Sequence, residues 1–402
     1  MTEDHADQFQ PHESDDSILS KTTLTEIDRP QPDRPQPDHP QPEQSRLDHK
    51  LPHLIYGDSL RVVAIILVIV SHVGALVVYR QPLRPENSAS WGLATFLMSI
   101  GRPCVPLFLM LSGCLLLNPQ KADEPIATFF RKRLSKVAIP GLFWAFIFLA
   151  WRRWGLKEPI SLVQGLQAIV SGTVFAHLWF IYLILGLYVM VPVLRVYIRG
   201  ASLKNQGYFL MVWFLLTALF PLLKRFFGFD FHGFVYIPLQ GYIGVFVGGY
   251  FLQQVTIAPW LRRLLPTTIV AFTAILSIAS YAVAARANST WDDYYYSYLN
   301  FFAVIMSACL FLVLRDFSYS RLFAKFPSLK AQIQWISALS FGVYLFHPIV
   351  LDILSWIVPP LTQSSVIANG GLMLSLILGT IVFSLAGVAL LRKIPFMRYL
   401  LP

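Results

Sequence analysis

Ten long apolar segments constrain the fold more than any other feature of this chain. An α-helix needs about 20 apolar residues to cross the hydrocarbon core of a bilayer. Of the 402 residues, 55% are hydrophobic and only 13% are charged, which excludes an ordinary water-soluble domain. We therefore expect an all-α, polytopic membrane protein with about ten transmembrane helices. The predicted helices lie at 60–79, 91–117, 134–151, 178–198, 208–223, 235–254, 266–286, 298–314, 335–358 and 372–391.

Loop charges predict how these helices are oriented. An even number of crossings places both termini on one side of the membrane. If the N-terminus is cytoplasmic, the inner loops and the C-terminus carry 17 basic residues and the outer loops carry 8. Because cytoplasmic loops are enriched in Lys and Arg, both termini are predicted to be cytoplasmic. No cleavable signal peptide is expected, since the first apolar run starts after residue 50 and is too long.

Residues 1–52 are predicted to form a disordered cytoplasmic tail. Residues 29–43 read RPQPD-RPQPD-HPQPE, a proline-rich repeat without an apolar face that favours polyproline II conformation. Such a repeat is either a solvated spacer or a docking site for a partner domain. Residues 53–402 are assigned to the membrane domain. Cytoplasmic loops and lipid head groups explain its basic character, so the expected partner is membrane lipid and not nucleic acid.

The three cysteines give no indication of a metal site. Cys104, Cys114 and Cys309 all fall inside apolar segments, and their spacing is not that of metal ligands. We expect them to be small core residues and expect no bound metal.

Two ionisable residues on the first segment are candidates for a functional site. Arg61 lies near the inner end, and His72 follows after ten intervening residues. At about 1.5 Å of rise per residue, His72 lies roughly 16 Å deeper than Arg61, near the middle of the bilayer. An imidazole at that depth is costly unless it faces protein or a wet cavity. It is either a functional residue or a structural histidine bonded to another helix.

Polar residues of two further segments are predicted to reach the same depth. Arg102 directly precedes Pro103, which opens the helix and frees backbone carbonyls. Its guanidinium either caps those carbonyls or stabilises an oxyanion. On the ninth segment, His347 lies about 18 Å from the inner end, and His347 and Tyr344 are either functional or packing residues. Asp352, further out, either pairs with a cation or orients a histidine.

Four motifs follow one another along the chain. They are Asp58-Ser-Leu-Arg61 with His72 downstream, Arg102-Pro-Cys-Val-Pro-Leu-Phe-Leu-Met-Leu-Ser112-Gly113, His177-Leu-Trp179-Phe-Ile-Tyr182 with Pro192 downstream, and Tyr344-Leu-Phe-His347. In this order and spacing they resemble the integral-membrane acyltransferase-3 family, whose members modify bacterial envelope glycans. The resemblance covers most of residues 54–360. The chain looks closest to the branch that O-acetylates enterobacterial common antigen.

The resemblance implies a multi-pass O-acyltransferase of the bacterial inner membrane. Such an enzyme moves an acyl group, commonly acetyl, from acyl-CoA to a sugar hydroxyl of an envelope polysaccharide or its lipid-linked precursor. Acyl-CoA, most simply acetyl-CoA, is then a co-substrate, and no permanently bound cofactor is expected. His72 matches the family's catalytic histidine and Arg61 its basic partner. The triplet Arg131-Lys132-Arg133 resembles a motif associated with the donor's phosphates, although by charge alone it is a basic cluster at the membrane surface.

These observations lead to an assignment of roles. Catalysis is assigned to His72, Arg61, Arg102 and His347. Donor binding from the cytoplasm is assigned to Arg61, Arg131, Arg133 and Ser112. Acceptor binding from the outer side is assigned to His177, Trp179 and Tyr344. His72 either takes the proton of the attacking hydroxyl as a general base or attacks the thioester itself, and the sequence is compatible with both routes.

A secondary transporter or flippase is the alternative function. Such proteins also combine many helices with helix-breaking prolines and buried charges. The chain has no convincing internal repeat and few mid-membrane carboxylates to couple ions. The acyltransferase interpretation is therefore favoured.

Overall fold

The structure is a computed structural model that describes residues 43–229, 240–287, 292–359, 361 and 365–401, with side chains from Ile55 onward. These residues form helices joined by turns and loops, with no β-strand among them. Contacts divide the chain into two compact units, residues 1–46 and 47–402. The predicted all-α class is confirmed. The predicted disorder of the tail falls mainly on residues 1–42, which lie outside the described residues.

Nine helical stretches of the described residues are long and apolar enough to cross a membrane. Nine of the ten predicted segments coincide with them. The predicted segment 235–254 begins outside the described residues, and its described part is the shorter helix α10. The first helix begins at Glu43, so residues 43–52 are helical although they are assigned to the tail.

The helices differ widely in length. They are α1 (Glu43–Val78), α2 (Ser88–Gly101), α3 (Cys104–Leu116), α4 (Ile126–Arg133), α5 (Ile139–Ala150), α6 (Leu162–Ser171), α7 (Trp179–Gly200), α8 (Leu203–Phe214), α9 (Phe220–Phe227), α10 (Ile243–Gln254), α11 (Pro259–Ala287), α12 (Asp293–Tyr296), α13 (Phe301–Arg315), α14 (Tyr319–Lys325), α15 (Pro327–Ile357), α16 (Val366–Leu391) and α17 (Met397–Leu400). The short 3-10 helices η1 (Pro85–Asn87) and η2 (Pro119–Lys121) lie in loops.

Three π-helical stretches interrupt or extend helices that the sequence predicts as regular. They are η3 (Leu134–Ala138), η4 (Trp151–Gly155) and η5 (Leu215–Leu219). η3 and η4 flank α5, so that α4 to η4 form one continuous rod. A π-helical stretch widens the turn and is often found near functional sites. In this protein η4 carries Trp151, whose indole N–H donates a hydrogen bond to Asp352 of α15.

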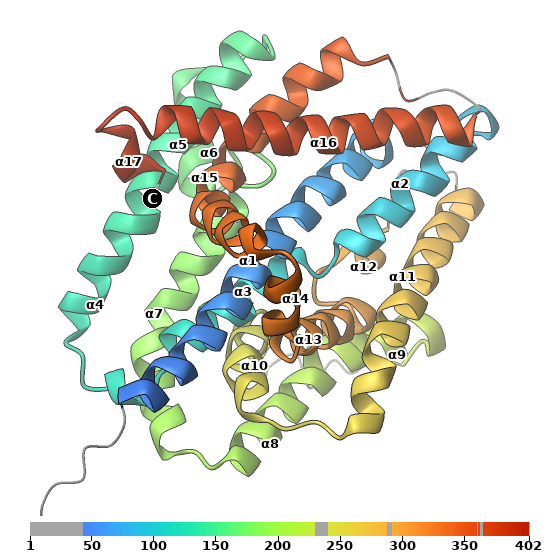
Figure 1. Ribbon diagram of the computed structural model, residues 1–402. Helices are drawn as coiled ribbons and strands as arrows, with labels where there is room; N and C mark the ends of the chain where they lie inside the picture. The colour runs from blue at the N-terminus through green and yellow to red at the C-terminus, as the bar shows by residue number, and fades with distance from the viewer. Residues whose placement is uncertain (1–42, 230–239, 288–291, 360, 362–364, 402) are drawn as a thin grey trace, which may run out of the picture. The chain divides into compact units, whose positions relative to one another are not determined.

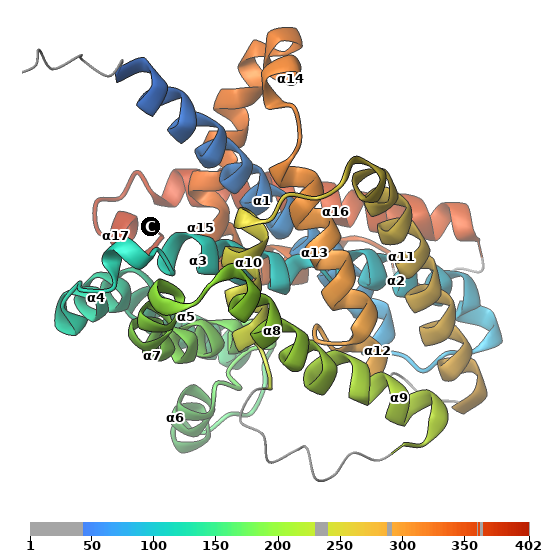
Figure 2. The same ribbon diagram turned by 90° about the horizontal axis from the view of Figure 1, so that it is seen from below.

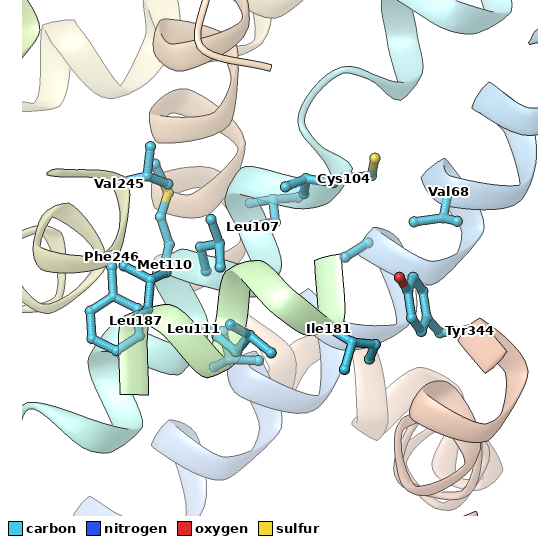
Figure 3. Packing of buried hydrophobic residues seen from close by; sticks show 14 of the residues in the cluster. Val68, Cys104, Leu107, Met110, Leu111, Ile181, Leu187, Val245, Phe246 and Tyr344 are labelled. Carbon is cyan, nitrogen blue, oxygen red and sulfur yellow. The ribbon is translucent and has the colours of Figure 1, made fainter. Parts of the chain in front are cut away.

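The helices of unit 47–402 pack around a large apolar core. α3 packs against α10, α11 against α2 and α13, and α15 against α16 (Figure 1). Figure 3 shows part of this core, with Leu107 and Met110 of α3 near Val245 and Phe246 of α10. Because lipid tails are as apolar as these side chains, close packing and not removal from water stabilises the bundle.

Two short helices mark opposite faces of the bundle. Figure 2 shows α6 and α14 projecting from opposite sides. α6 precedes α7, and α14 precedes α15. The loop between α6 and α7 therefore lies at the face opposite to the start of α15, and the functional residues lie between these two faces.

Candidate active site

His72 of α1 and His347 of α15 form a hydrogen-bonded pair. His347 Nε2 lies 2.9 Å from His72 Nδ1. The other nitrogen of His347, Nδ1, lies 2.9 Å from the carbonyl oxygen of Tyr344 and 3.1 Å from that of Val343. A carbonyl oxygen only accepts, so His347 Nδ1 carries a hydrogen. In a neutral pair, His347 Nε2 then accepts a hydrogen bond from His72 Nδ1, which leaves the lone pair of His72 on Nε2.

Pro348 explains why the ring of His347 is held in this orientation. Proline has no N–H, so the carbonyl of Tyr344, four residues earlier in α15, does not receive its usual helical hydrogen bond. His347 Nδ1 takes the place of that donor. The ring is fully buried, so it has no route to solvent. The His-Pro sequence thus fixes which nitrogen of His72 is free to act on a ligand.

Arg102 occupies the break between α2 and α3, as the Arg-Pro sequence predicts. Its Nε donates to the carbonyl oxygen of Met98 at 2.9 Å, and its Nη1 donates to the carbonyl oxygen of Tyr296. Its Nη2 donates to Ser71 Oγ at 2.9 Å. The guanidinium also lies 4.6 Å from the ring centroid of Tyr298. Arg102 therefore caps backbone carbonyls. It also binds Ser71, the residue that directly precedes His72.

Close approach of α1 and α2 brings Arg102 to this position. A Cβ on Gly101 would lie 2.6 Å from Ser71 Cβ and 3.0 Å from the carbonyl oxygen of Leu67. Any larger residue would push the two helices apart. The glycine therefore sets the distance between Arg102 and His72.

A cavity of about 470 Å³ opens beside His72, and we name it the outer cavity because it lies toward the predicted outer side. This volume falls in the range of roughly 300–1,000 Å³ that is typical of small-molecule sites. His72, Arg102 and His177 line it together with aromatic rings. Trp179 stacks on Tyr298, with ring centroids 5.8 Å apart and an angle of 24° between the planes. The structure thus places His177 and Trp179, both assigned to the acceptor, in one cavity with His72.

His177 is a third imidazole in this layer and lies in the loop before α7. Its ring centroid is 5.7 Å from that of His347. Neither ring nitrogen has a hydrogen bond of ordinary geometry to another described residue. Burial, and then the neighbouring His347 and His72, hold the pKa of His177 well below its ordinary value of 6.5, against a smaller opposite effect of the Leu345 backbone. His177 is therefore held as a neutral imidazole in the wall of the outer cavity.

A smaller cavity of about 160 Å³ lies toward the predicted cytoplasmic side, and we name it the inner cavity. Its walls are mainly apolar and include Phe108 and Ile184. Ser112 also lines it and donates a hydrogen bond to the carbonyl oxygen of Phe108 at 2.8 Å. Arg61 lies in its wall with 35% of the side chain exposed. Arg61 thus belongs to a different cavity from His72.

Arg61 has partners of its own at the inner cavity. Its Nη1 lies 3.2 Å from Asp58 Oδ1 and 3.5 Å from Ser337 Oγ. Ser337 in turn donates to the same carboxylate oxygen at 2.7 Å. These contacts tie α1 to α15 and hold the guanidinium at the cavity wall.

Tyr344 lies between the two cavities. It lines the inner cavity, and its hydroxyl donates to the carbonyl oxygen of His177, which lines the outer cavity. The ring of Phe180 is 5.6 Å from that of Tyr344 and also lines the inner cavity. Tyr344 is therefore a boundary residue that lines the inner cavity and not the outer cavity, where the other residues assigned to the acceptor lie.

The basic triplet lies on α4, and its three residues have different surroundings. Arg131 is exposed. Arg133 is half-buried, and its guanidinium lies 5.8 Å from the ring centroid of Phe129. Phe129 is 6.2 Å from Tyr188, which lines the inner cavity. Of the two arginines of this triplet, Arg133 is thus connected to the inner cavity through aromatic contacts.

Glu124 holds the start of α4 in place. It accepts a hydrogen bond from Lys132 at 2.7 Å and from the buried Arg195 of α7 at 2.9 Å. These bonds, Lys132 first, lower the pKa of Glu124 below its ordinary value of 4.5. The carboxylate is therefore ionised at pH 7 and fixes α4 against α7.

A polar group at the mouth of the outer cavity includes residues that the sequence did not single out. Asp352 Oδ2 accepts from Trp151 Nε1 at 3.0 Å, and Oδ1 lies 3.7 Å from Arg80 Nη2. Of the two roles predicted for Asp352, pairing with a cation and orienting a histidine, the structure shows the first. Trp151 stacks on Trp356, with centroids 5.6 Å apart and 16° between the planes. No sequence spacing relates Arg80, Trp151 and Trp356, so no signal pointed to this group.

Comparison with known proteins agrees with this geometry. No curated protein and no solved structure matched the chain. Residues 54–391 match the profile of the acyltransferase-3 family, which is described as an acyltransferase domain. Because this match spans most of the sequence, the chain belongs to the acyltransferase-3 family and is a membrane acyltransferase.

Proposed function

We propose that this protein transfers an acyl group, most simply acetyl, from cytoplasmic acyl-CoA to a sugar hydroxyl of an envelope polysaccharide or its lipid-linked precursor at the bacterial inner membrane. The observation that carries the proposal is the bonded pair His72–His347 at the wall of an aromatic cavity. Enterobacterial common antigen is one acceptor of this class, and only the order of the sequence motifs supports it.

The free Nε2 of His72 is the proposed general base. It takes the proton of the acceptor hydroxyl while the oxygen attacks the thioester carbonyl. The tetrahedral intermediate then collapses, the C–S bond breaks, and His72 returns the proton to the CoA sulfur. Base catalysis of this kind typically contributes about a hundredfold to ten-thousandfold. The N–H groups of Arg102 are the proposed donors to the oxyanion. Transfer through an acyl-His72 intermediate uses the same residues and is the second route.

The inner cavity is the proposed path for the pantetheine arm of acyl-CoA. Arg61 and Arg133 offer cations to its phosphates, with the exposed Arg131 further out. The apolar walls suit a thin uncharged chain, and Ser112 offers a hydroxyl oxygen as an acceptor for its amides. Because Tyr344 stands between the cavities, we propose that its ring turns aside when the thioester passes toward His72.

The outer cavity is the proposed site of the acceptor sugar. An aromatic face such as that of Trp179, which Tyr298 supports by stacking, can pack against the C–H groups of a sugar ring. The unpaired nitrogens of His177 are hydrogen-bonding groups for sugar hydroxyls. A two-sided arrangement of this kind requires no movement of CoA across the membrane.

Mass spectrometry of envelope glycans from cells with and without the protein tests the proposal, since the mass difference identifies both the acyl group and its carrier. Purified protein should consume acyl-CoA in the presence of that glycan. His72→Ala should abolish consumption while the melting temperature in detergent stays within a few degrees. Solute movement without acyl-CoA consumption would instead favour the transporter alternative.

A further inference from the structure

A second cavity shares a wall with the outer cavity. It has a volume of about 280 Å³, and Leu76 and Arg80 line both cavities. Its other walls include Gln81, Ser355 and Trp356. The two cavities are therefore neighbours that meet at Leu76 and Arg80, and we name the second one the side cavity.

The side cavity has a flat aromatic wall. Trp356 stacks on Trp151, so one face of its ring is covered by another indole. The residue is nevertheless 56% exposed and lines the side cavity, so the part of the ring that Trp151 does not cover is accessible. Trp151 is itself fixed by its hydrogen bond to Asp352. The open face of Trp356 is thus a rigid platform, and an immobilised ring loses little entropy when it binds.

Charged and polar groups surround this platform. The Arg80–Asp352 pair stands where the two cavities meet, and at 3.7 Å it is too long for a tight ion pair. Arg80 keeps 55% of its side chain exposed, and its guanidinium has donors to spare. Gln81 also lines the side cavity, where its amide N–H groups are donors, while its side-chain oxygen accepts from Asn87 Nδ2 at 3.4 Å. A flat aromatic face beside donors and acceptors suits a sugar ring, which has an apolar face and a rim of hydroxyls.

We propose that the side cavity is a second sugar subsite, so that the acceptor is an oligosaccharide or longer glycan and not a single sugar. This inference rests on the proposed function. The sugar that receives the acyl group occupies the outer cavity, and its neighbour in the glycan packs on Trp356. Arg80 and Asp352 hydrogen-bond to the two units where they are linked.

Glycan binding tests the inference without requiring catalysis. Full-length protein in lipid nanodiscs is applied to immobilised bacterial-type monosaccharides, disaccharides and longer oligosaccharides. The best disaccharide should bind about tenfold more tightly than its monosaccharide, since aromatic residues at binding surfaces often contribute this much. Trp356→Ala should remove this advantage and leave monosaccharide binding unchanged. Trp356→Phe should retain most of it.

Trp154 provides the matched control, because it is another exposed tryptophan that lines neither of these two cavities. Trp154→Ala should leave glycan binding unchanged. If Trp154→Ala and Trp356→Ala have the same effect, Trp356 anchors the protein in lipid and the inference is wrong. Equal binding of monosaccharides and oligosaccharides, or no glycan binding, would also overturn it. Acyl transfer to a sugar without any dependence on glycan length would overturn the second subsite alone and leave the proposed function standing.

Discussion

The inner and outer cavities differ in size, lining and charge. The inner cavity is narrow and mainly apolar, and Arg61 is its one cation. The outer cavity has about three times the volume, and it combines aromatic rings with five imidazole, guanidinium or carboxylate groups, compared with one in the inner cavity. A narrow apolar passage with a cation in its wall suits a long arm with a charged end, whereas a wide polar aromatic chamber suits a hydroxyl-rich ring. This difference supports the proposal that the donor binds in the inner cavity and the acceptor in the outer cavity, with Tyr344 and the histidines between them.

The largest effect is expected at the histidine pair. His347→Leu removes the acceptor that orients His72, so kcat should fall about ten- to hundredfold with little change in either KM, as for other supporting partners of reactive groups. His347→Gln, whose side-chain oxygen can accept from His72 Nδ1, should recover part of the rate. Equal loss in both variants, with intact melting temperature, would show that the pairing does not orient His72.

Comparing the variants Arg61→Ala and Arg80→Ala tests whether the inner and outer cavities bind different substrates. Arg61→Ala should raise the KM for acyl-CoA about tenfold, because charge-assisted hydrogen bonds to phosphate are lost. The KM for the acceptor should not change. Arg80→Ala should have the opposite pattern. Two-substrate kinetics that show both KM values rising together in either variant would contradict the separation.

Tyr344 tests the boundary itself. Tyr344→Phe removes the hydrogen bond to the His177 carbonyl, and a bond worth about 1 kcal/mol corresponds to about a fivefold easier opening. We expect acceptor-independent hydrolysis of acyl-CoA to rise by that factor, as measured by thiol release. Tyr188→Phe, in the same cavity but without contact to His177, is the control. Unchanged hydrolysis in Tyr344→Phe would mean that Tyr344 does not close the passage.

The smallest effect is expected at Glu124, which supports the inner side only. Its lowered pKa means that it contributes stability above about pH 4.5 and loses this contribution as the pH falls through the lowered value. Glu124→Gln should therefore reduce the melting temperature at pH 7 by about 2 °C, with a difference that shrinks below pH 4.5. A difference that stays constant with pH would show that the charge is not responsible. The KM for the acceptor should be unaffected.

The sequence predicted the depth of the site better than its lateral arrangement. Because every helical residue advances the chain by the same rise, counting along two segments places Arg102 and His347 at the level of His72, and both are found there. Counting could not show that His347 contacts His72, since this depends on how α1 and α15 are rotated. It also could not connect Trp151, Trp356 and Arg80, which come from three separate segments.

Loops and proline effects account for the remaining differences. His177 lies in a loop, so its depth in the membrane could not be calculated from the rise of a helix. Only the sequence motif around it indicated a role. Pro348 was visible in the sequence, but its consequence depends on which donor reaches the carbonyl that it frees. The π-helical stretches have no clear sequence signal, because their hydrogen-bond shift depends on packing. Helix content was therefore readily predicted, and side-chain pairing was not.

One helix contributes walls to every compartment. Along α15, Ser340 and Tyr344 face the inner cavity, His347 binds His72, and Asp352 reaches the outer mouth. Inserting or deleting a single residue between them would rotate all later side chains by about 100° around the helix axis. The number of residues between 340 and 352 therefore determines which cavity each of these side chains faces. Enzymes engineered for new acyl groups or new glycans can exchange these side chains, but they cannot insert or delete residues between them.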